Sequence, residues 1–243
     1  MYYTAKYTIP SYLCDHNDKL TMWGLARLFQ DVAGGHVEKE GLGFASLIEQ
    51  GKAWVLCRSL YQINRLPKEC EEITIKTWSR GTDGLFAFRE YQVFDNHNNI
   101  IASCSSYWAV IDFVSRHVVR LNNLMDKFEH HDDSSTGFNK IDRIRFPHNF
   151  EPKEIVSQFT VTASMLDHTL HVNNAEYIKW IFDNLFSNPL SIISSPFTLI
   201  VEYPLETKPE ETISIFKFSD DLSTFFQISN PRGVAFKAKL VQL

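Results

Sequence analysis

The two halves of this 243-residue chain repeat the same order of elements, and this repetition limits the fold more than any other feature. Each half reads as a strand, an apolar helical stripe and a run of strands. At an offset of 152 residues, similar residues coincide: Asp15 with Asp167, His16 with His168, Leu20 with Val172, Phe29 with Ile181, Asp31 with Asp183. At an offset of 140, EITIKTWS (72–79) lies over TISIFKFS (212–219). The pattern indicates a duplication.

The apolar residues give the expected elements. Helical spacing joins Leu25, Leu28, Phe29, Val32 and Ala33 in the first half, and Tyr177, Ile178, Ile181, Phe182 and Leu185 in the second. Strands are expected at 2–9, 54–64, 72–80, 85–95 and 100–113, and again at 159–165, 197–203, 212–219, 222–229 and 233–241. A long helix wrapped by an antiparallel sheet is the hotdog arrangement. Two tandem copies predict a double hotdog of the α+β class.

We expect three parts in the chain. Residues 1–128 form an N-terminal hotdog repeat without a complete catalytic set, 129–149 a linker, and 150–243 a C-terminal repeat that carries the active site. The linker begins with EHHDDSSTGFNK (129–140), which is polar and has no period. Its adjacent His and Asp side chains point in divergent directions, so we interpret it as solvated chain and expect no metal site.

Composition excludes several classes of function. With 44% apolar and 22% charged residues, the chain is typical of a soluble globular protein, and the net charge of −5 argues against a nucleic-acid partner. The four scattered cysteines favour reduced thiols. No apolar run approaches the ~18 residues of a membrane span, and no export signal is evident. We therefore expect a cytoplasmic protein. No phosphate or dinucleotide motif is present, so no cofactor is expected.

A polar cluster, LDHTLHVNN (166–174), directly precedes the second helical stripe. Asn173 suits a helix N-cap, and Asp167 or Thr169 could bond turn amides, so the cluster could be purely structural. That interpretation does not account for His171, which stands two residues before the cap.

The duplication separates structural residues from chemical ones. Lys19 occupies the position of His171 in the first half, and Asn17 that of Thr169. Near the next strand, Leu66 and Pro67 occupy the positions of Glu206 and Thr207. Scaffold residues should occur in both copies, whereas a single site should not. The sequence therefore predicts one site, in the C-terminal half.

These groups suit attack of water on an acyl carbonyl. The free N–H groups at a helix start, here near Val172 to Asn174, can stabilise an oxyanion. His171 or Glu206 could take a proton from water, while Asp167 or Thr169 could orient the partner. No Ser or Cys lies in a nucleophile-elbow pattern.

The chain resembles the acyl-ACP thioesterase family of plant plastids and bacteria. In the first half, the resemblance rests on GFASLIEQGKAWVLCRSLYQI (43–63), TWSRG (77–81) and SYWAVIDFVSRHVVR (106–120). In the second, it rests on LDHTLHVNNAEYIKW (166–180) and VEYPLET (201–207). The resemblance implies hydrolysis of fatty acyl thioesters of acyl carrier protein, during fatty acid biosynthesis.

Carried over residue by residue, the resemblance implies that Asp167, His171 and Glu206 are catalytic. Two positions depart from the plant pattern: Thr169 replaces an Asn, and Thr207 replaces a Cys. The second departure argues against a covalent Cys mechanism, because a Thr hydroxyl without a strong base is a poor nucleophile. We expect Thr169 to complete the catalytic set, and Val172, Asn173, Asn174 and Thr207 to contact the substrate.

Three alternatives stay open at this point. The chain could hydrolyse acyl-CoA, act as a hotdog dehydratase on a 3-hydroxyacyl thioester, or bind acyl thioesters without catalysis. Acyl carrier protein is the expected partner. Because the duplication already pairs two hotdog units, a monomer is as acceptable as a homodimer.

Overall fold

The computed structural model describes residues 2–121, 124–125, 128–147, 150, 155–188, 193 and 195–242. The chain divides into two compact units, 1–141 and 142–243. Within the described residues, no helix is both long and apolar enough to cross a membrane.

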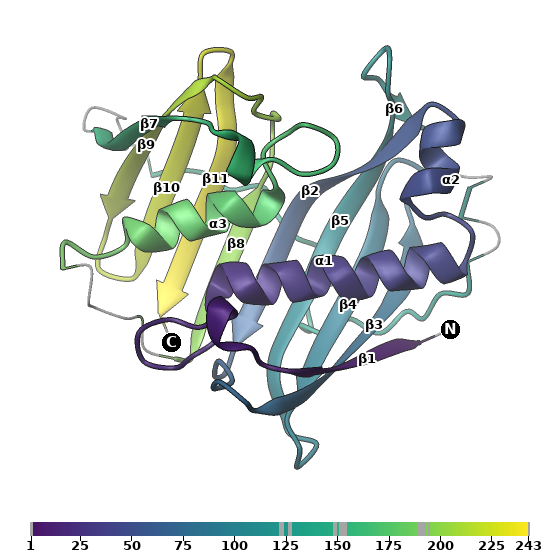
Figure 1. Ribbon diagram of the computed structural model, residues 1–243, viewed down its shortest axis with the longest axis horizontal. Helices are drawn as coiled ribbons and strands as arrows, with labels where there is room; N and C mark the ends of the chain where they lie inside the picture. The colour runs from purple at the N-terminus through teal and green to yellow at the C-terminus, as the bar shows by residue number, and fades with distance from the viewer. Residues whose placement is uncertain are drawn as a thin grey trace. The chain divides into compact units, whose positions relative to one another are not determined.

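The first unit is an antiparallel sheet with a long helix across it (Figure 1). Its strands lie in the order β1 (Tyr3–Thr8), β3 (Glu72–Thr82), β4 (Ala87–Phe94), β5 (Ile100–Asp112) and β2 (Lys52–Ile63). A short strand, β6 (Val118–Val119), pairs with β5. The helix α1 spans Met22–Lys39, and a shorter helix α2, Phe44–Glu49, lies in a segment for which no helix was expected.

The second unit repeats this topology. Its strands lie in the order β7 (Ile155–Thr160), β9 (Thr212–Ser219), β10 (Ser223–Asn230), β11 (Gly233–Gln242) and β8 (Phe197–Glu202), with helix α3 at Asn174–Asp183. Even the strand register is preserved: Thr8 pairs with Glu72 in the first unit, and Thr160 pairs with Thr212 in the second. These pairs differ by the same offsets of 152 and 140 that align the sequence.

Helix α1 follows directly from its sequence. The Thr21 side chain caps its start by accepting a hydrogen bond from the Gly24 N–H at 3.1 Å. The five expected apolar residues of the stripe are all buried. The helix continues through Gly35, where a side chain would collide with the Tyr3 hydroxyl, 2.5 Å from the position of a Cβ atom. Here glycine allows β1 to approach the helix closely.

The strand predicted at 159–165 is partly wrong. β7 ends at Thr160, and a 3-10 turn follows at Ala163–Met165. The Met165 carbonyl oxygen accepts the Asn173 N–H at 2.9 Å, so this stretch closes the polar turn that precedes α3 instead of extending the sheet. The first unit has the same arrangement, with a 3-10 turn at Ser11–Leu13.

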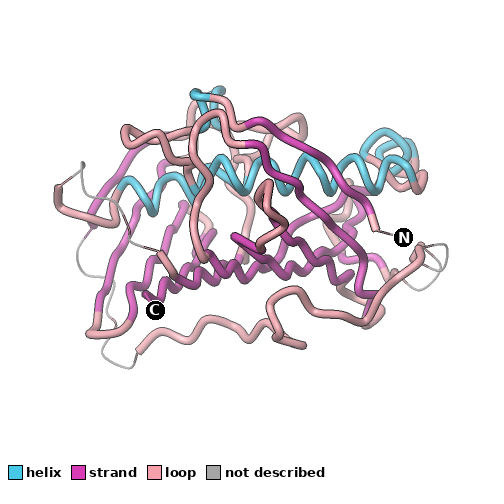
Figure 2. The backbone as a smooth tube through the Cα atoms, turned by 90° about the horizontal axis from the view of Figure 1, so that it is seen from below, coloured by secondary structure: helices cyan, strands magenta, loops and turns pink. Residues whose placement is uncertain are grey.

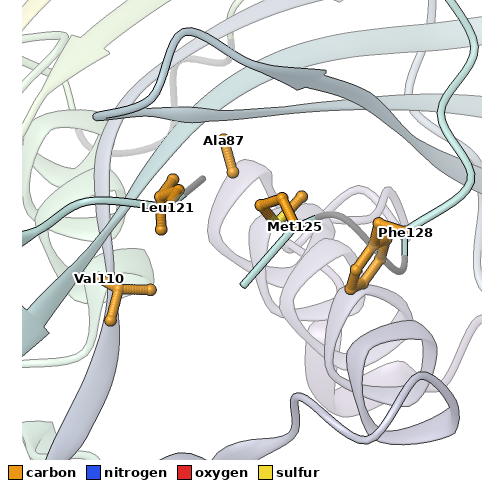
Figure 3. Packing of buried hydrophobic residues seen from close by; sticks show 5 residues of the cluster. All are labelled: Ala87, Val110, Leu121, Met125 and Phe128. Atoms are coloured by element: carbon orange, nitrogen blue, oxygen red, sulfur yellow. The ribbon is translucent and has the colours of Figure 1, made fainter. Parts of the chain in front are cut away.

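The segment expected to be a solvated linker runs along the first unit. Most side chains at 129–140 are exposed, but Trp78 Nε1 donates to the Asp133 carbonyl oxygen at 3.0 Å. Figure 2 shows α1 on one side of the strands and a loop segment on the other. Just before this segment, Leu121, Met125 and Phe128 form a small core cluster with Ala87 of β4 and Val110 of β5 (Figure 3).

Glu90 fastens this segment to the sheet. Its carboxylate is fully buried and accepts hydrogen bonds from Arg80 Nε at 2.9 Å, Ser105 Oγ at 2.6 Å and Ser135 N at 2.9 Å. Burial raises the pKa of Glu90, and the hydrogen bonds and Arg80 oppose that rise. The carboxylate therefore depends on these partners to stay ionised inside the protein.

Replacing Glu90 with Gln should reduce the free energy of unfolding by about 3 kcal/mol, because the Arg80 charge would lose its buried partner. Urea denaturation of the purified chain measures this. The exposed Glu72, changed to Gln, is the control and should shift stability by less than ~0.5 kcal/mol. Equal, small effects of both changes would contradict the anchoring role of Glu90.

Candidate active site

A tight turn before α3 carries the polar cluster. The Asp167 N–H donates to the His171 carbonyl oxygen at 2.8 Å, and the Leu170 N–H donates to the Asp167 carbonyl oxygen at 3.0 Å. Leu170 adopts a φ of +61°, which the turn requires. The Asp167 side chain accepts the Thr169 N–H at 2.8 Å and stabilises the turn from inside.

Four of the predicted side chains form one continuous polar chain. Thr169 Oγ1 donates to Asp167 Oδ1 at 2.5 Å and lies 3.1 Å from His171 Nδ1. On the other side of the ring, His171 Nε2 lies 3.4 Å from Glu206 Oε2. The structure thus brings together Asp167, Thr169, His171 and Glu206, which come from two segments far apart in the sequence.

The hydroxyl of Thr169 favours one tautomer of His171. A hydroxyl has one proton, and the short distance to the Asp167 carboxylate assigns that proton to this bond. Thr169 Oγ1 must then accept from His171, so Nδ1 carries a proton. In a neutral imidazole, Nε2 is consequently the basic nitrogen, and it faces Glu206.

The working end of this chain is accessible. The side chains of His171 and Glu206 keep 18% and 27% of their surface exposed. Both groups can therefore meet a substrate or a water molecule while the half-buried Asp167 and Thr169 support them. A basic nitrogen and a carboxylate 3.4 Å apart are suited to accept and return a proton.

Thr207, the residue after Glu206, is part of the packed interior of the second unit. Its side chain is fully buried, and its hydroxyl accepts a hydrogen bond from Asn230 Nδ2 at 3.1 Å. Its carbonyl oxygen accepts the Val172 N–H at 2.9 Å. Thr207 thus joins the Glu206 loop to the turn that carries His171, and its contact with substrate stays a prediction.

At the start of α3, some of the backbone N–H groups expected to stabilise an oxyanion are already hydrogen-bonded within the protein. The Val172 N–H is bonded to Thr207, and the Asn173 N–H is bonded to the Met165 carbonyl oxygen. Asn173 is the N-cap, and its side chain accepts the Ala175 N–H at 2.9 Å. Among the described residues, the Asn174 N–H has no hydrogen-bond acceptor. This N–H is left as the candidate oxyanion donor.

The first unit contains the same framework without the same chemical groups. The Asp15 N–H donates to the Lys19 carbonyl oxygen at 2.7 Å, and Asp15 Oδ1 accepts the Asn17 N–H at 2.8 Å. The Leu20 N–H donates to Pro67 at 2.8 Å, as Val172 does to Thr207. The backbone of the site is therefore duplicated, whereas its imidazole and its second carboxylate are not.

Two residues near the site were not expected from the sequence. Asn230 and Arg232 lie at the turn between β10 and β11, and both donate to the Glu206 carbonyl oxygen. The sequence NPRG (230–233) indicates a turn, but nothing in it shows which loop the turn contacts. Tyr177 on α3 also borders this region, and burial raises its pKa to about 12.

Metal chemistry has no evident ligand set in the part of the chain that the structure describes. There, no three His, Cys, Asp or Glu side chains come close enough to hold an ion.

The repeated sheet-and-helix units define the chain as a double hotdog, with a polar site at the start of α3. Profiles of the acyl-ACP thioesterase N-terminal domain and C-terminal domain match residues 1–127 and 150–239. The chain belongs to the acyl-ACP thioesterase family.

Plant relatives are distant. An oleoyl-acyl carrier protein thioesterase of Arabidopsis thaliana is 22% identical over 238 residues, which cover 90% of this chain and 63% of the relative. A similar enzyme of Coriandrum sativum is 25% identical and covers 75% and 53%. The chain thus spans only about half to two thirds of the length of these relatives.

Solved structures share the fold over nearly the whole chain. An acyl-ACP thioesterase from Bacteroides thetaiotaomicron superimposes with a TM-score of 0.78 at 23% identity, covering 99% of this chain and 97% of the other. A 12:0-ACP thioesterase from Umbellularia californica gives 0.84 at 16% identity, covering 99% and 96%. At these identities, the agreement establishes the hotdog fold.

The tautomer of His171 is a direct test of the polar chain. In ¹⁵N-edited NMR at pH 8, His171 should show a protonated Nδ1 in the wild type. Thr169→Val removes the acceptor and should produce a mixture of tautomers, whereas the control Thr169→Ser keeps the hydroxyl and the original tautomer. A protonated Nε2 and bare Nδ1 in the wild type would contradict the assignment.

Proposed function

We propose that this protein hydrolyses fatty acyl-ACP thioesters and releases free fatty acids during fatty acid biosynthesis. The observation that carries the proposal is the chain Asp167–Thr169–His171–Glu206 in the second unit, of which the first unit keeps only the aspartate. Membership of the acyl-ACP thioesterase family supports this substrate class. We further propose that the protein acts in the cytoplasm, as a monomer or a homodimer.

In the proposed mechanism, Glu206 takes a proton from a water molecule that attacks the thioester carbonyl. Thr169 and Asp167 hold the ring of His171 through Nδ1, so that Nε2 faces both Glu206 and the reacting atoms. This arrangement would position the water and stabilise the charge that forms when the proton is transferred. We propose water as the nucleophile because the Thr169 hydroxyl is engaged by Asp167 and His171 and the Thr207 hydroxyl is buried.

Attack of water produces a tetrahedral oxyanion. We propose that the Asn174 N–H at the first position of α3 stabilises it, aided by the positive end of the helix dipole. The C–S bond then breaks, and the thiolate of the carrier's phosphopantetheine leaves. The proton taken from water returns to that sulfur, so the products are a carboxylic acid and a free thiol.

Three alternatives differ from this proposal in substrate or in chemistry. Hydrolysis of acyl-CoA would use the same groups, because only recognition of the carrier distinguishes the two thioesters. A non-catalytic acyl-binding protein would not require the complete polar chain, which therefore favours catalysis. Dehydration would yield an enoyl thioester instead of a free acid.

The test is release of free fatty acid from a panel of C6 to C18 acyl-ACPs and the corresponding acyl-CoAs. His171→Ala and Glu206→Ala should each lower the turnover number at least ~100-fold, within the range for acid–base groups. Lys19→Ala, at the matching position of the first repeat, is the control and should leave turnover unchanged.

The possible results separate the alternatives. Faster turnover of acyl-CoA than of acyl-ACP would favour the CoA thioesterase, and an enoyl product would favour the dehydratase. Tight acyl-ACP binding without any product in the wild type would favour the binding protein. Normal turnover in either alanine variant would remove that residue from the mechanism.

A further inference from the structure

The main chain of Glu206 is held by two side chains from another part of the second unit. Its carbonyl oxygen accepts a hydrogen bond from Asn230 Nδ2 at 3.1 Å and another from Arg232 Nη2 at 2.6 Å. The same Asn230 amide also donates to Thr207 Oγ1 at 3.1 Å. The loop is therefore fixed at the residue that carries the catalytic carboxylate and at the next one.

The two donors are themselves held in place. Asn230 is 7% exposed, and its Oδ1 accepts the Arg232 N–H at 2.9 Å. Arg232 pairs with Glu211 through Nε at 2.7 Å and Nη2 at 3.2 Å. The connecting turn has two residues, and it closes at Gly233 with a φ of +138°, a conformation that favours glycine. Because these hydrogen bonds already restrict the rotamers of Asn230 and Arg232, the two side chains lose little conformational entropy when they bind Glu206.

The strand registers locate the equivalent of Asn230 in the first repeat. Thr74 pairs with Phe94, and Ser214 pairs with Ser229, so the residues that follow are equivalent: Asp95 and Asn230. Asp95 is an acceptor, whereas the Asn230 amide is also a donor. Because the second repeat has an amide where the first has an acid, its turn can donate a hydrogen bond to a carbonyl oxygen.

Each repeat also has an arginine that links the loop to the turn, but this arginine comes from a different segment in each repeat. Glu71 and Glu211 are equivalent at the offset of 140, and each pairs with an arginine. In the first repeat this is Arg65, which lies in the loop itself and pairs with both Glu71 and Asp95. In the second it is Arg232, from the turn. Both repeats thus have an ion pair that joins the loop to the turn. In the second repeat, the donors of the turn also reach the carbonyl oxygen of Glu206.

We propose that Asn230 and Arg232 are positioning residues for thioester hydrolysis, which fix the Glu206 main chain and so set its carboxylate against His171. This inference rests on the proposed function. Its physical basis is that a displacement of ~1 Å in a reacting group can cost about 10²-fold in rate. The 3.4 Å separation of Glu206 and His171 leaves little room for such a displacement.

The experiment compares steady-state hydrolysis of one acyl-ACP by four variants of the full chain. Asn230→Asp introduces the first-repeat residue, and Arg232→Ala removes the second donor; each should lower kcat ~10-fold while KM changes less than ~2-fold. Arg232→Lys keeps one donor and should recover most of kcat. Arg65→Ala breaks the matching ion pair in the first repeat and should leave kcat unchanged.

The contrast between the two arginines decides the question. If Arg232→Ala and Arg65→Ala lower kcat equally, or if Arg232→Lys is no better than Arg232→Ala, Arg232 has only a structural role and the proposal is wrong. Unchanged kcat in Asn230→Asp and Arg232→Ala would overturn it as well.

A second readout does not depend on activity. Amide hydrogen exchange at Val172 reports the hydrogen bond to Thr207, and exchange at Leu20 reports the matching bond to Pro67. Arg232→Ala should accelerate exchange at Val172 but not at Leu20. An inactive wild type would refute the proposed function, while exchange would still show whether Arg232 fixes the loop; unchanged exchange at Val172 would refute the positioning.

Discussion

One backbone hydrogen bond, from the Val172 N–H to the Thr207 carbonyl oxygen at 2.9 Å, joins the two segments that make the site. Val172 follows His171 directly, and Thr207 follows Glu206 directly. The bond therefore fixes the imidazole and the carboxylate as neighbours, although 35 residues separate them in the sequence. Its cost is that the Val172 N–H is no longer available to a substrate.

Duplication explains how such a site could arise without a new scaffold. The first unit makes the equivalent bond, from Leu20 to Pro67, with the same Asp-stabilised turn before it. On this framework, Lys19 and Leu66 occupy the positions of His171 and Glu206. In both units, backbone hydrogen bonds hold the turn and the loop together. The chemistry therefore depends on a few side chains that only the second unit has.

Much of the architecture could be predicted because it depends on local periodicity. The alternating β9 segment, for example, was expected at 212–219 and lies at those residues. Features that depend on contacts between distant segments could not be predicted. Neither the end of β7 at Thr160 nor the burial of Thr207 is encoded in neighbouring residues, because both depend on how the turn before α3 closes against other segments.

The candidate site, too, could be predicted only in part. The fold brings together the expected set Asp167, Thr169, His171 and Glu206. Comparison of the repeats singles out the last three, and the family resemblance adds Asp167. Asn230 could not be found in this way. Its contribution depends on an amide reaching the carbonyl oxygen of a residue 24 positions away, a contact set by the β10–β11 turn.

The most direct test gives the second repeat the residues that the first repeat has at the positions of His171 and Glu206. Single-turnover hydrolysis of an acyl-ACP would be measured for a variant with His171→Lys and Glu206→Leu, the residues of the first repeat. Because the framework is common to both units, the variant should fold and keep its circular dichroism spectrum, while the rate falls at least ~100-fold. A rate close to that of the wild type would mean that the active site lies elsewhere.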